Sequence, residues 1–493
     1  DFMVKFNAIF GFHRLAINGM DNISNQPIIS NNILLICNGE IYNYKQLYEE
    51  LALHPDSILS NCDCEVIIHM YLKYGIDYTL RQLDAEFAFI LFDFRDKNNT
   101  NLFIARDPFG VRPLFMGGSC NYIGFASEMK QLHAITPTEY IRQFTPATYM
   151  HFKHNIHTNK WKSNNVRYVY TTFSFRKQPQ LKMEHYLDGI RKNFIEAVKK
   201  RVENCERPIA CLLSGGLDSS LVTSIVSKLS KTRIETFSIG LKGSEDLKYA
   251  KIVADFLGTK HTEIVISEEE FFERIPEVIK VIESYDTTTV RASVGNYLVA
   301  EYISENSDAK VIINGDGSDE LMGGYLYFSA APDSMEFDKE CMKLLNNIHY
   351  FDGLRSDRCI SANGLEARTP FLDRGWVEYY LSIPIHLRNH NNIYRNVNRI
   401  EKFLIRNAFD IKNNPSIIKQ PYNTEYKEFL PKEILYRKKE AFSDGVSSHT
   451  KSWFEIIDDK ISHLHGDKYK MGVYNSEQFI ENRPTTQEQN YYR

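Results

Sequence analysis

The sequence predicts an α/β protein with two large domains, the first rich in strands and the second alternating between strands and helices. A chain of 493 residues is too long for one ordinary hydrophobic core, which argues for more than one domain. In the first part, short apolar runs alternate with turn residues, as in residues 33–37 before Asn38-Gly39. Beyond residue 183, helical spacing of apolar residues precedes a buried strand at 209–213, which is typical of a parallel sheet flanked by helices.

A polar stretch separates the two patterns. Residues 153–182 carry His, Asn, Lys and Gln without helical periodicity, which suits a connection between domains. We therefore predict a first domain at residues 1–160, a linker at 161–183 and a second domain at 184–493. The second domain ends in helix-rich sequence, and its ligands are expected at the carboxyl ends of the parallel strands.

The charge balance argues against a polyanionic partner. The 59 basic and 63 acidic side chains nearly cancel, so no overall positive field is present to hold nucleic acid. We expect the cluster Lys199-Lys200-Arg201 to be the solvated end of a helix. No apolar stretch approaches the roughly 20 residues that cross a bilayer, and the N-terminus shows no secretory signal. We therefore expect no membrane partner and a cytoplasmic location.

The cysteines are expected to be reduced thiols. Eight of them are scattered along the chain without a CxxC pair, which fits neither a disulfide framework nor a zinc site. Cys62-Asp63-Cys64 has the wrong spacing for a zinc knuckle. Together with Cys37, these cysteines are predicted to serve packing.

The most informative segment is the glycine-serine loop that follows the strand at 209–213. Glycines allow the backbone to approach an anion, and serine hydroxyls and free N–H groups at a helix start supply donors. The loop lacks the Gly-Lys-Ser/Thr ending of a Walker A loop, so release of pyrophosphate is favoured over transfer of a terminal phosphate. Asp218 is the candidate ligand for Mg²⁺. A plain turn that caps a helix is the alternative. The candidate residues are Ser214, Gly215, Gly216, Asp218, Ser219 and Ser220.

This loop resembles the SGGxDS loop of the ATP-pyrophosphatase group, which includes asparagine, argininosuccinate, GMP and NAD synthetases and β-lactam synthetase. Further motifs resemble the asparagine synthetase family within that group. They lie at residues 284–293, 314–325, 364–373, 401–406 and 437–445. The resemblance covers nearly the whole chain, and its motifs are specific jointly rather than singly.

The resemblance implies an ATP-dependent carbon–nitrogen ligase with ATP and Mg²⁺ as cofactors. Aspartate's β-carboxylate attacks the α-phosphorus of ATP to give β-aspartyl-AMP and pyrophosphate, and ammonia then displaces AMP. Lys439 neutralises phosphate charge, Asp316 and Asp319 orient an amine or a metal, and Glu366 supports formation of the intermediate and attack by ammonia. Arg291 completes the catalytic set. The adenosine positions are Leu212, Ile239, Asn314 and Gly315.

Two residues depart from the family pattern. Asp316 stands where many members carry Glu, and Asn314 replaces a common Ser. Shortening a carboxylate arm by one methylene moves the carboxylate by about 1 Å, which matters where catalysis is limited by geometry. We therefore expect a different contact at residue 316.

The first domain resembles a class II glutamine amidotransferase, an N-terminal-nucleophile hydrolase fold with two β-sheets sandwiched by helices. The match lies at residues 14–17, 38–43, 63–66, 106–110 and 126–130. By resemblance, the arginine grips glutamine's α-carboxylate, two acidic residues hold its ammonium, and an asparagine amide with a glycine N–H forms an oxyanion hole. The glutamine-binding set is Arg14, Leu15, Ala16, Ile17, Asn18, Asn38, Gly39, Glu40 and Asp63.

The family's nucleophile is a cysteine at the extreme N-terminus, whose free α-amine serves as the base. Residue 1 here is Asp. We expect a sequence that lacks its terminal segments rather than a degenerate enzyme, because the glutamine-binding set is retained. The chain as written is expected to hydrolyse no glutamine and to use free ammonia.

Other interpretations stay open. A β-lactam synthetase-like enzyme or another amide ligase would activate a different acid, and a catalytically silent homologue would serve regulation or assembly. The small-molecule partners are expected to be aspartate and glutamine or ammonia. A homodimer is one arrangement that the sequence leaves open.

Overall fold

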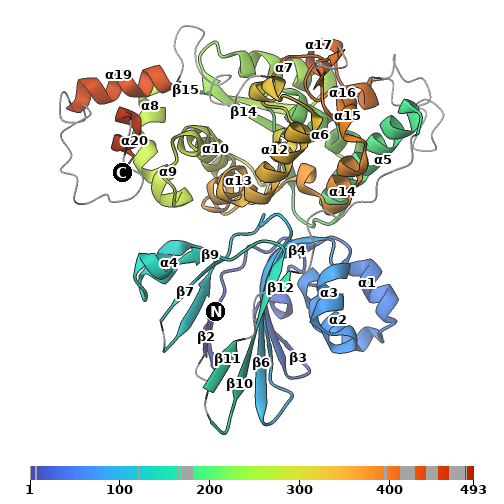
Figure 1. Ribbon diagram of the computed structural model, residues 1–493, viewed down its shortest axis with the longest axis vertical. Helices are drawn as coiled ribbons and strands as arrows, with labels where there is room; N and C mark the ends of the chain where they lie inside the picture. Colours follow the sequence, from blue (N-terminus) through green and yellow to red (C-terminus); the bar gives the residue numbers. More distant parts are fainter. Residues whose placement is uncertain are drawn as a thin grey trace.

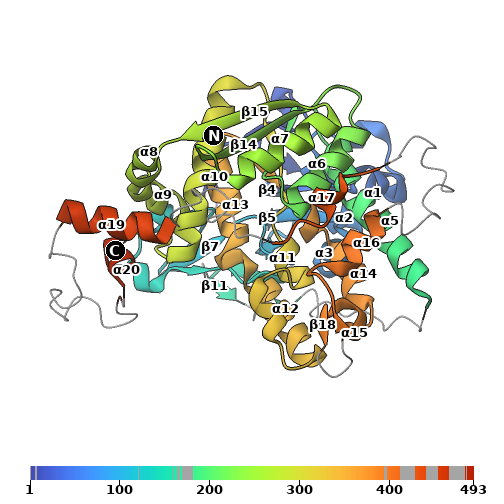
Figure 2. The same cartoon turned by 90° about the horizontal axis from the view of Figure 1, so that it is seen from above.

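The computed structural model places the two parts of the chain in two adjoining bodies, with the first part below the second in Figure 1 and the second part seen from above in Figure 2. The structure describes residues 2–5, 8–119, 121–158, 160–163, 167–168, 181–392, 397–410, 428–439, 453–465, 484 and 486–492. The predicted α/β organisation is confirmed, with an antiparallel first part and a parallel second part.

The first part builds an antiparallel sheet in the order β11-β10-β6-β5-β4-β3, with β12 added beside β10. Its strands are β3 (Ile28–Ser30), β4 (Ile33–Ile41), β5 (Ala85–Asp93), β6 (Asn99–Arg106), β10 (Thr148–Asn155), β11 (Lys160–Ser163) and β12 (Arg167–Tyr168). Successive side chains point to opposite faces, so that Ile33 and Leu35 join one core and Leu34 joins another. The apolar runs are therefore buried on both faces.

Different elements cover the two faces of this sheet. The face of Ile33 is packed by α1 (Tyr44–Leu51), α2 (Val66–Tyr74) and α3 (Ile76–Gln82). The face of Leu34 meets β2 and a small sheet in the order β8-β7-β9, beside which α4 lies. The elements of this side are β1 (Phe2–Lys5), β2 (Ala8–Gly11), β7 (Phe115–Gly118), β8 (Ile123–Ala126), α4 (Met129–His133) and β9 (Arg142–Gln143). The predicted β-sandwich with flanking helices is confirmed.

The second part is built on a parallel sheet in the order β15-β14-β13-β16-β17. Its strands are β13 (Ile209–Leu212), β14 (Glu235–Leu241), β15 (Lys260–Ile266), β16 (Val311–Ile313) and β17 (Glu366–Arg368). The chain proceeds outward from β13 through β14 to β15, then returns to the other side of β13. The strand order therefore reverses between β13 and β16, and a crevice opens there beyond the carboxyl ends of both strands.

Helices pack on both faces of the parallel sheet. One face carries α5 (Met183–Glu203), α6 (Leu217–Leu229), α7 (Glu245–Leu257), α12 (Ser334–Asn347), α14 (Arg374–Ser382), α16 (Phe403–Phe409) and α17 (Lys432–Leu435). The other carries α8 (Glu268–Glu273), α9 (Ile275–Ile282), α10 (Thr287–Asn306), α13 (Asp352–Ser361), α19 (Trp453–His465) and α20 (Gln487–Tyr491). The remaining elements are α11 (Ser318–Met322), α15 (Ile385–Arg388), β18 (Asn391–Asn392) and β19 (Val397–Asn398). Among the helices described here, none is both long and apolar enough to pass through a bilayer.

The predicted linker at 161–183 is described only in part. Residues 160–163 and 167–168 pair with β10, and α5 begins at Met183. Residues 164–166 and 169–180 lie outside the described residues, as do residues 440–445 of the last motif.

The cluster Lys199-Lys200-Arg201 corrects one expectation. Arg201 is 1% exposed and lies between the two parts of the chain, with its guanidinium 2.7 Å from Glu86 and 2.9 Å from Asp373. Lys200 Nζ lies 3.1 Å from the same Asp373 carboxylate. The prediction of a solvated helix end is therefore wrong for these two residues, because the first domain packs against the end of α5.

Candidate active site

A glycine-serine loop joins β13 to α6 at the point where the strand order reverses. Gly215 adopts a φ of +69°, and a Cβ there would meet the backbone of Tyr249 and Ala250 at 2.4 Å, so the position requires glycine. The hydroxyls of Ser214 and Ser219 lie 3.0 Å apart, and Ser219 Oγ also accepts from the Ser214 N–H at 3.2 Å. Together with the free N–H groups at the start of α6, these donors form a cradle for an anion.

Helix α6 begins within the segment that the sequence predicted to be a loop. Because α6 starts at Leu217, the residues Asp218, Ser219 and Ser220 occupy its first turn rather than the loop. Ser220 is fully buried and faces the core. Asp218 and Ser219 face the pocket that lies beyond the strand ends.

The loop after β16 closes on the loop after β13. A Cβ on Gly315 would meet the Ser219 nitrogen at 2.9 Å and the Asp218 carbonyl carbon at 3.0 Å, so glycine permits this approach. The Ser318 hydroxyl, at the start of α11, donates to Asp218 Oδ1 at 2.7 Å. The two loops therefore form one continuous polar wall.

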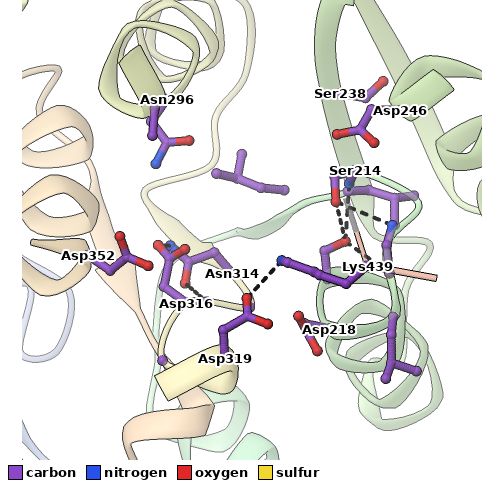
Figure 3. Close-up of a pocket in the computed structure, with 18 of the residues that line it drawn as sticks. Ser214, Asp218, Ser238, Asp246, Asn296, Asn314, Asp316, Asp319, Asp352 and Lys439 are labelled. Atoms are coloured by element: carbon purple, nitrogen blue, oxygen red, sulfur yellow. Dashed lines mark hydrogen bonds and ion pairs between the residues drawn. The ribbon is translucent and has the colours of Figure 1, made fainter. Parts of the chain in front are cut away.

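Carboxylates and ammonium groups meet beside the cradle, and Figure 3 shows the contact of Lys439 with Asp319. Lys402 Nζ lies 2.6 Å from Asp218 Oδ2 and 2.5 Å from Asp319 Oδ1, and Lys439 Nζ lies 2.8 Å from Asp319 Oδ2. Burial opposes ionisation of Asp319, but the two lysines outweigh it and hold its pKa well below the usual range. Burial likewise favours neutral Lys439, yet Asp319 and Asp218 raise its pKa. Asp319 and Lys439 therefore stay charged, and the Lys439 ammonium can meet phosphate oxygens.

The two departures from the family pattern contact each other. Asn314 Nδ2 donates to Asp316 Oδ2 at 2.9 Å and to Ser356 Oγ at 2.6 Å. Arg355 Nη2 lies 3.0 Å from Asp316 Oδ1 and 3.3 Å from Asp352. Burial raises the pKa of Asp316, and Arg355 opposes this rise. The longer amide arm at 314 thus reaches the shorter carboxylate at 316.

Most of the predicted nucleotide and catalytic residues line this one pocket. The pocket brings together Leu212, Ser214, Gly216, Asp218, Ser219, Ile239, Asn314, Gly315, Asp316, Asp319 and Lys439. Gly215 shapes the loop without lining the pocket, and Ser220 lies behind it.

Two predicted catalytic residues lie outside the pocket lining. Arg291 Nε lies 2.9 Å from Glu488 of the C-terminal helix α20, and its guanidinium lies over Phe454. Glu366, at the start of β17, lies 2.8 Å from Arg368 and 3.4 Å from Arg112 of the first domain. Glu366 therefore faces the boundary between the two domains.

The pocket also contains residues that the sequence did not single out. Lys402 belongs to a quoted motif, but only the structure shows it between two aspartates. Arg437 donates to the Ser214 carbonyl at 3.4 Å and lies 3.1 Å from Asp246. Other such lining residues are Ser238, Thr288, Asn296, Asp352 and Arg355. They come from three elements far apart in the chain, β14, α10 and α13, so only the fold shows that they share a site.

In the first domain, Arg14 is held by the turn that follows it. Its Nη2 donates to the Gly19 carbonyl at 2.8 Å, and its Nη1 donates to Asn25 Oδ1 at 3.3 Å. Leu15 is 39% exposed and Ala16 is half-buried, whereas Ile17 is buried in the core of the second domain. The predicted segment 14–18 thus reaches from the surface into the domain boundary.

The predicted acidic pair of the glutamine set is buried at the end of β4. Asn18 Nδ2 donates to Glu40 Oε2 at 2.6 Å, and Asp63 Oδ2 accepts from the Ile41 N–H at 2.6 Å. Burial raises the pKa of Glu40, and the charge of Asp63 adds to the effect. Arg368 Nη2, from the second domain, lies 3.1 Å from Glu40. The Glu40 side chain of the first domain is therefore in direct contact with Arg368 on β17 of the second domain.

The predicted oxyanion residues lie on β4 itself. Asn38 pairs with Ala88 and Gly39 with Phe87 across the antiparallel ladder. A Cβ on Gly39 would meet the Glu86 carbonyl oxygen at 2.3 Å, so the close strand approach requires glycine.

Comparison with known proteins finds a separate family match for each of the two parts of the chain. The asparagine synthase family matches residues 189–337 and 329–491, and the glutamine amidotransferase domain matches residues 1–184. The chain belongs to the asparagine synthetase family. It is 40% identical over 515 residues to the glutamine-hydrolysing asparagine synthetase of Gallus gallus, covering 99% of this chain and 85% of that one. Identity is 39% to the probable enzyme of Acanthamoeba polyphaga mimivirus, covering 98% and 84%, and 38% to that of Homo sapiens, covering 99% and 85%.

Proposed function

We propose that this chain makes asparagine from aspartate, ATP and ammonia, with glutamine as the further ammonia source, through a β-aspartyl-AMP intermediate and with release of AMP and pyrophosphate. The observation that carries the proposal is the anion cradle of Ser214–Ser219 facing Lys402 and Lys439 at the reversal of the strand order. Family membership indicates the class of reaction, and the anion cradle supplies the donors that bind the leaving pyrophosphate.

The cradle holds the two phosphates that leave. Backbone N–H groups at the start of α6 and the hydroxyls of Ser214 and Ser219 donate to pyrophosphate oxygens. Lys439 neutralises the charge that develops at the α-phosphorus as aspartate's carboxylate attacks. Leu212, Ile239 and the backbone of 314–315 hold the adenosine.

The donor set also fits Mg²⁺, because carboxylate oxygens are its preferred protein ligands and Asp218 and Asp319 lie on either side of Lys402. When bound, Mg²⁺ supplies further neutralisation of phosphate charge. Asp218 accepts from Ser318 and Lys402, so it would hold Mg²⁺ in place of one of these partners.

The two remaining carboxylates are assigned to the substrates. Asp316, held by Asn314 and Arg355, is oriented toward the amino group of aspartate. Glu366 lies at the domain boundary, where it can accept a proton from ammonia that arrives from the first domain. Glu40 and Asp63 bind the ammonium of glutamine, and Arg14 binds its carboxylate.

We also propose the domain bounds, the cellular location and the oligomeric state. The domains are assigned to residues 1–160 and 184–493 with a linker at 161–183, and the protein is assigned to the cytoplasm as a homodimer. Gel filtration of the purified chain tests the last point.

The test is synthesis of asparagine by the purified chain from aspartate, ATP, Mg²⁺ and ammonium. We expect asparagine and pyrophosphate in equal amounts, and Lys439→Met should lower kcat by about 100-fold or more, as loss of one charge-stabilising group does. Lys251→Met, in an exposed pair with Asp255, is the control and should keep the parental rate. Formation of ADP, or pyrophosphate exchange supported by another acid but not by aspartate, would refute the proposed substrate.

A further inference from the structure

Three thiols and a carboxylate gather at the end of β4 in the first domain. Cys62 and Cys64 flank Asp63 at the short helix η3 (Asp63–Glu65), and Cys37 of β4 lies near Cys64. The Cys62 Sγ lies 3.9 Å from Asp63 Oδ1, and the Cys64 Sγ lies 3.9 Å from Asp63 Oδ2. The donor atoms of the consecutive three lie within 4.8 Å of one another.

The group is buried and carries a charge without a matching cation. Asp63 is 3% exposed, and within the described residues it enters no salt bridge. Glu40 of the glutamine set is also buried, and it has Arg368 as its own partner. A buried carboxylate that is hydrogen-bonded but lacks an ion-pair partner is costly, so a cationic ligand at this point stabilises the folded chain.

We propose that Cys62, Asp63 and Cys64 bind one thiophilic divalent cation of the zinc class, with solvent in the fourth position. A tetrahedral zinc ion with bonds of about 2.0–2.3 Å places neighbouring donors about 3.5–3.8 Å apart. Each thiol lies 3.9 Å from a different oxygen of Asp63, and with one donor atom per residue the three lie within 4.8 Å of one another, so rotation of these side chains is needed to reach this spacing. Each thiol that binds releases its proton to solvent. Thiolate donors select against Mg²⁺.

The Cys-x-Cys spacing alone could not show this site, because it does not indicate where the three side chains lie relative to one another. Cys64 Sγ lies 3.5 Å from the Gly39 carbonyl, and this contact brings η3 against β4 beside Cys37. The site therefore depends on tertiary packing rather than on a linear motif.

Metal binding has a consequence for the first domain, which rests on the proposed function. If Asp63 binds the ammonium of glutamine, a metal that takes the same carboxylate excludes glutamine. The cation then acts as an inhibitor of the glutamine-dependent reaction, while ammonia-dependent synthesis in the second domain continues.

Cobalt titration of the reduced full-length chain, without oxygen, tests the site. We expect one equivalent of Co²⁺ to produce a thiolate-to-cobalt charge-transfer band that Zn²⁺ abolishes. Cys62→Ser and Cys64→Ser should each weaken binding by tenfold or more, because each removes one ligand. Cys341→Ser, a buried thiol packed against Phe328 and Phe337 in the second domain, is the matched control and should bind as the parent does.

Circular dichroism of both ligand variants verifies that they fold, and either one suffices for the comparison. Absence of the band in the parent, or a band of parental affinity in Cys62→Ser and in Cys64→Ser, would overturn the proposal.

A second measurement separates this inference from the proposed function. Calorimetry should show glutamine binding weakened tenfold or more by one equivalent of Zn²⁺ in the parent but not in Cys64→Ser. Cobalt binding with unchanged glutamine affinity supports the metal site and refutes the inhibition. Cobalt binding in a chain that binds no glutamine supports the metal site and counts against the function proposed for the first domain.

Discussion

Lys402 is the position where the structure makes its sharpest prediction. Its ammonium lies 2.6 Å from Asp218 and 2.5 Å from Asp319, and its side chain is 1% exposed. Lys402→Met keeps the aliphatic length and removes the charge. Among the ion pairs of the described residues, Asp218 then loses its lysine partner and Asp319 keeps only Lys439.

The magnitude follows from burial. Removing one partner of a buried ion pair leaves an uncompensated charge and costs about 3–5 kcal/mol. We expect Lys402→Met to lower the free energy of unfolding by about this amount. The matched control is Lys339→Met, whose ammonium lies 2.5 Å from Glu336 but is 66% exposed. An exposed pair contributes about 0–1 kcal/mol at most, so the control should be nearly neutral.

Urea unfolding followed by circular dichroism measures both variants against the parent. The same preparations are assayed for asparagine formed from aspartate, ATP and ammonium, where Lys402→Met should lose activity beyond its loss of stability at temperatures below unfolding. If Lys402→Met and Lys339→Met destabilise the chain equally, the two aspartates do not depend on the buried ammonium, and the electrostatic account of the pocket fails.

Further predictions concern the loop, the pH dependence and the domain boundary. The Cβ of Gly215→Ala meets backbone at 2.4 Å, so this variant should lose about 1–3 kcal/mol of unfolding free energy and form asparagine more than tenfold more slowly. Gly243→Ala, at a position with positive φ but open space, is the control and should keep the parental rate. Kinetic and unfolding assays of both variants test this. Burial lowers the pKa of His261 from 6.5 to about 4, so unfolding takes up a proton below pH 6.5 and stability is lost as the pH falls toward 4. A urea series across this range should show a shallower fall for His261→Asn. Arg201→Met leaves the buried carboxylate of Glu86 without its 2.7 Å partner and should cost about 3–5 kcal/mol in thermal or urea unfolding; a loss below 1 kcal/mol would contradict this.

The local parts of the site were predictable from the sequence, and the long-range parts were not. Ser214–Ser219 could be recognised because strand, loop and helix follow one another directly in the chain. The approach of Gly315 to the same loop follows from the rule that parallel strands end at one edge of the sheet. Arg201 was misjudged, because a basic cluster at a helix end gives no sign that another domain covers it.

Arg291 shows the same limit from the other direction. Its motif predicts a catalytic arginine, but the structure pairs it with Glu488, almost two hundred residues later. Spacing along the chain carries no information on such a partner. Lys402 was likewise hidden, since its role depends on Asp218 and Asp319, which come from the first turns of two helices, α6 and α11.

Arg368 connects the two sites across the domain boundary. Arg368 is fully buried, lies 3.1 Å from Glu40 of the first domain and 2.8 Å from Glu366 of the second, and donates to the Arg201 carbonyl at 2.7 Å. Without the first domain, Arg368 keeps one carboxylate partner, and Glu366 loses its contact with Arg112. The second domain therefore owes part of the position of Glu366 to the first domain. Each domain supplies ion-pair partners for buried charges of the other, so separating the domains leaves these charges exposed or unpaired. The contacts that hold the two sites together therefore also contribute to the free energy of unfolding.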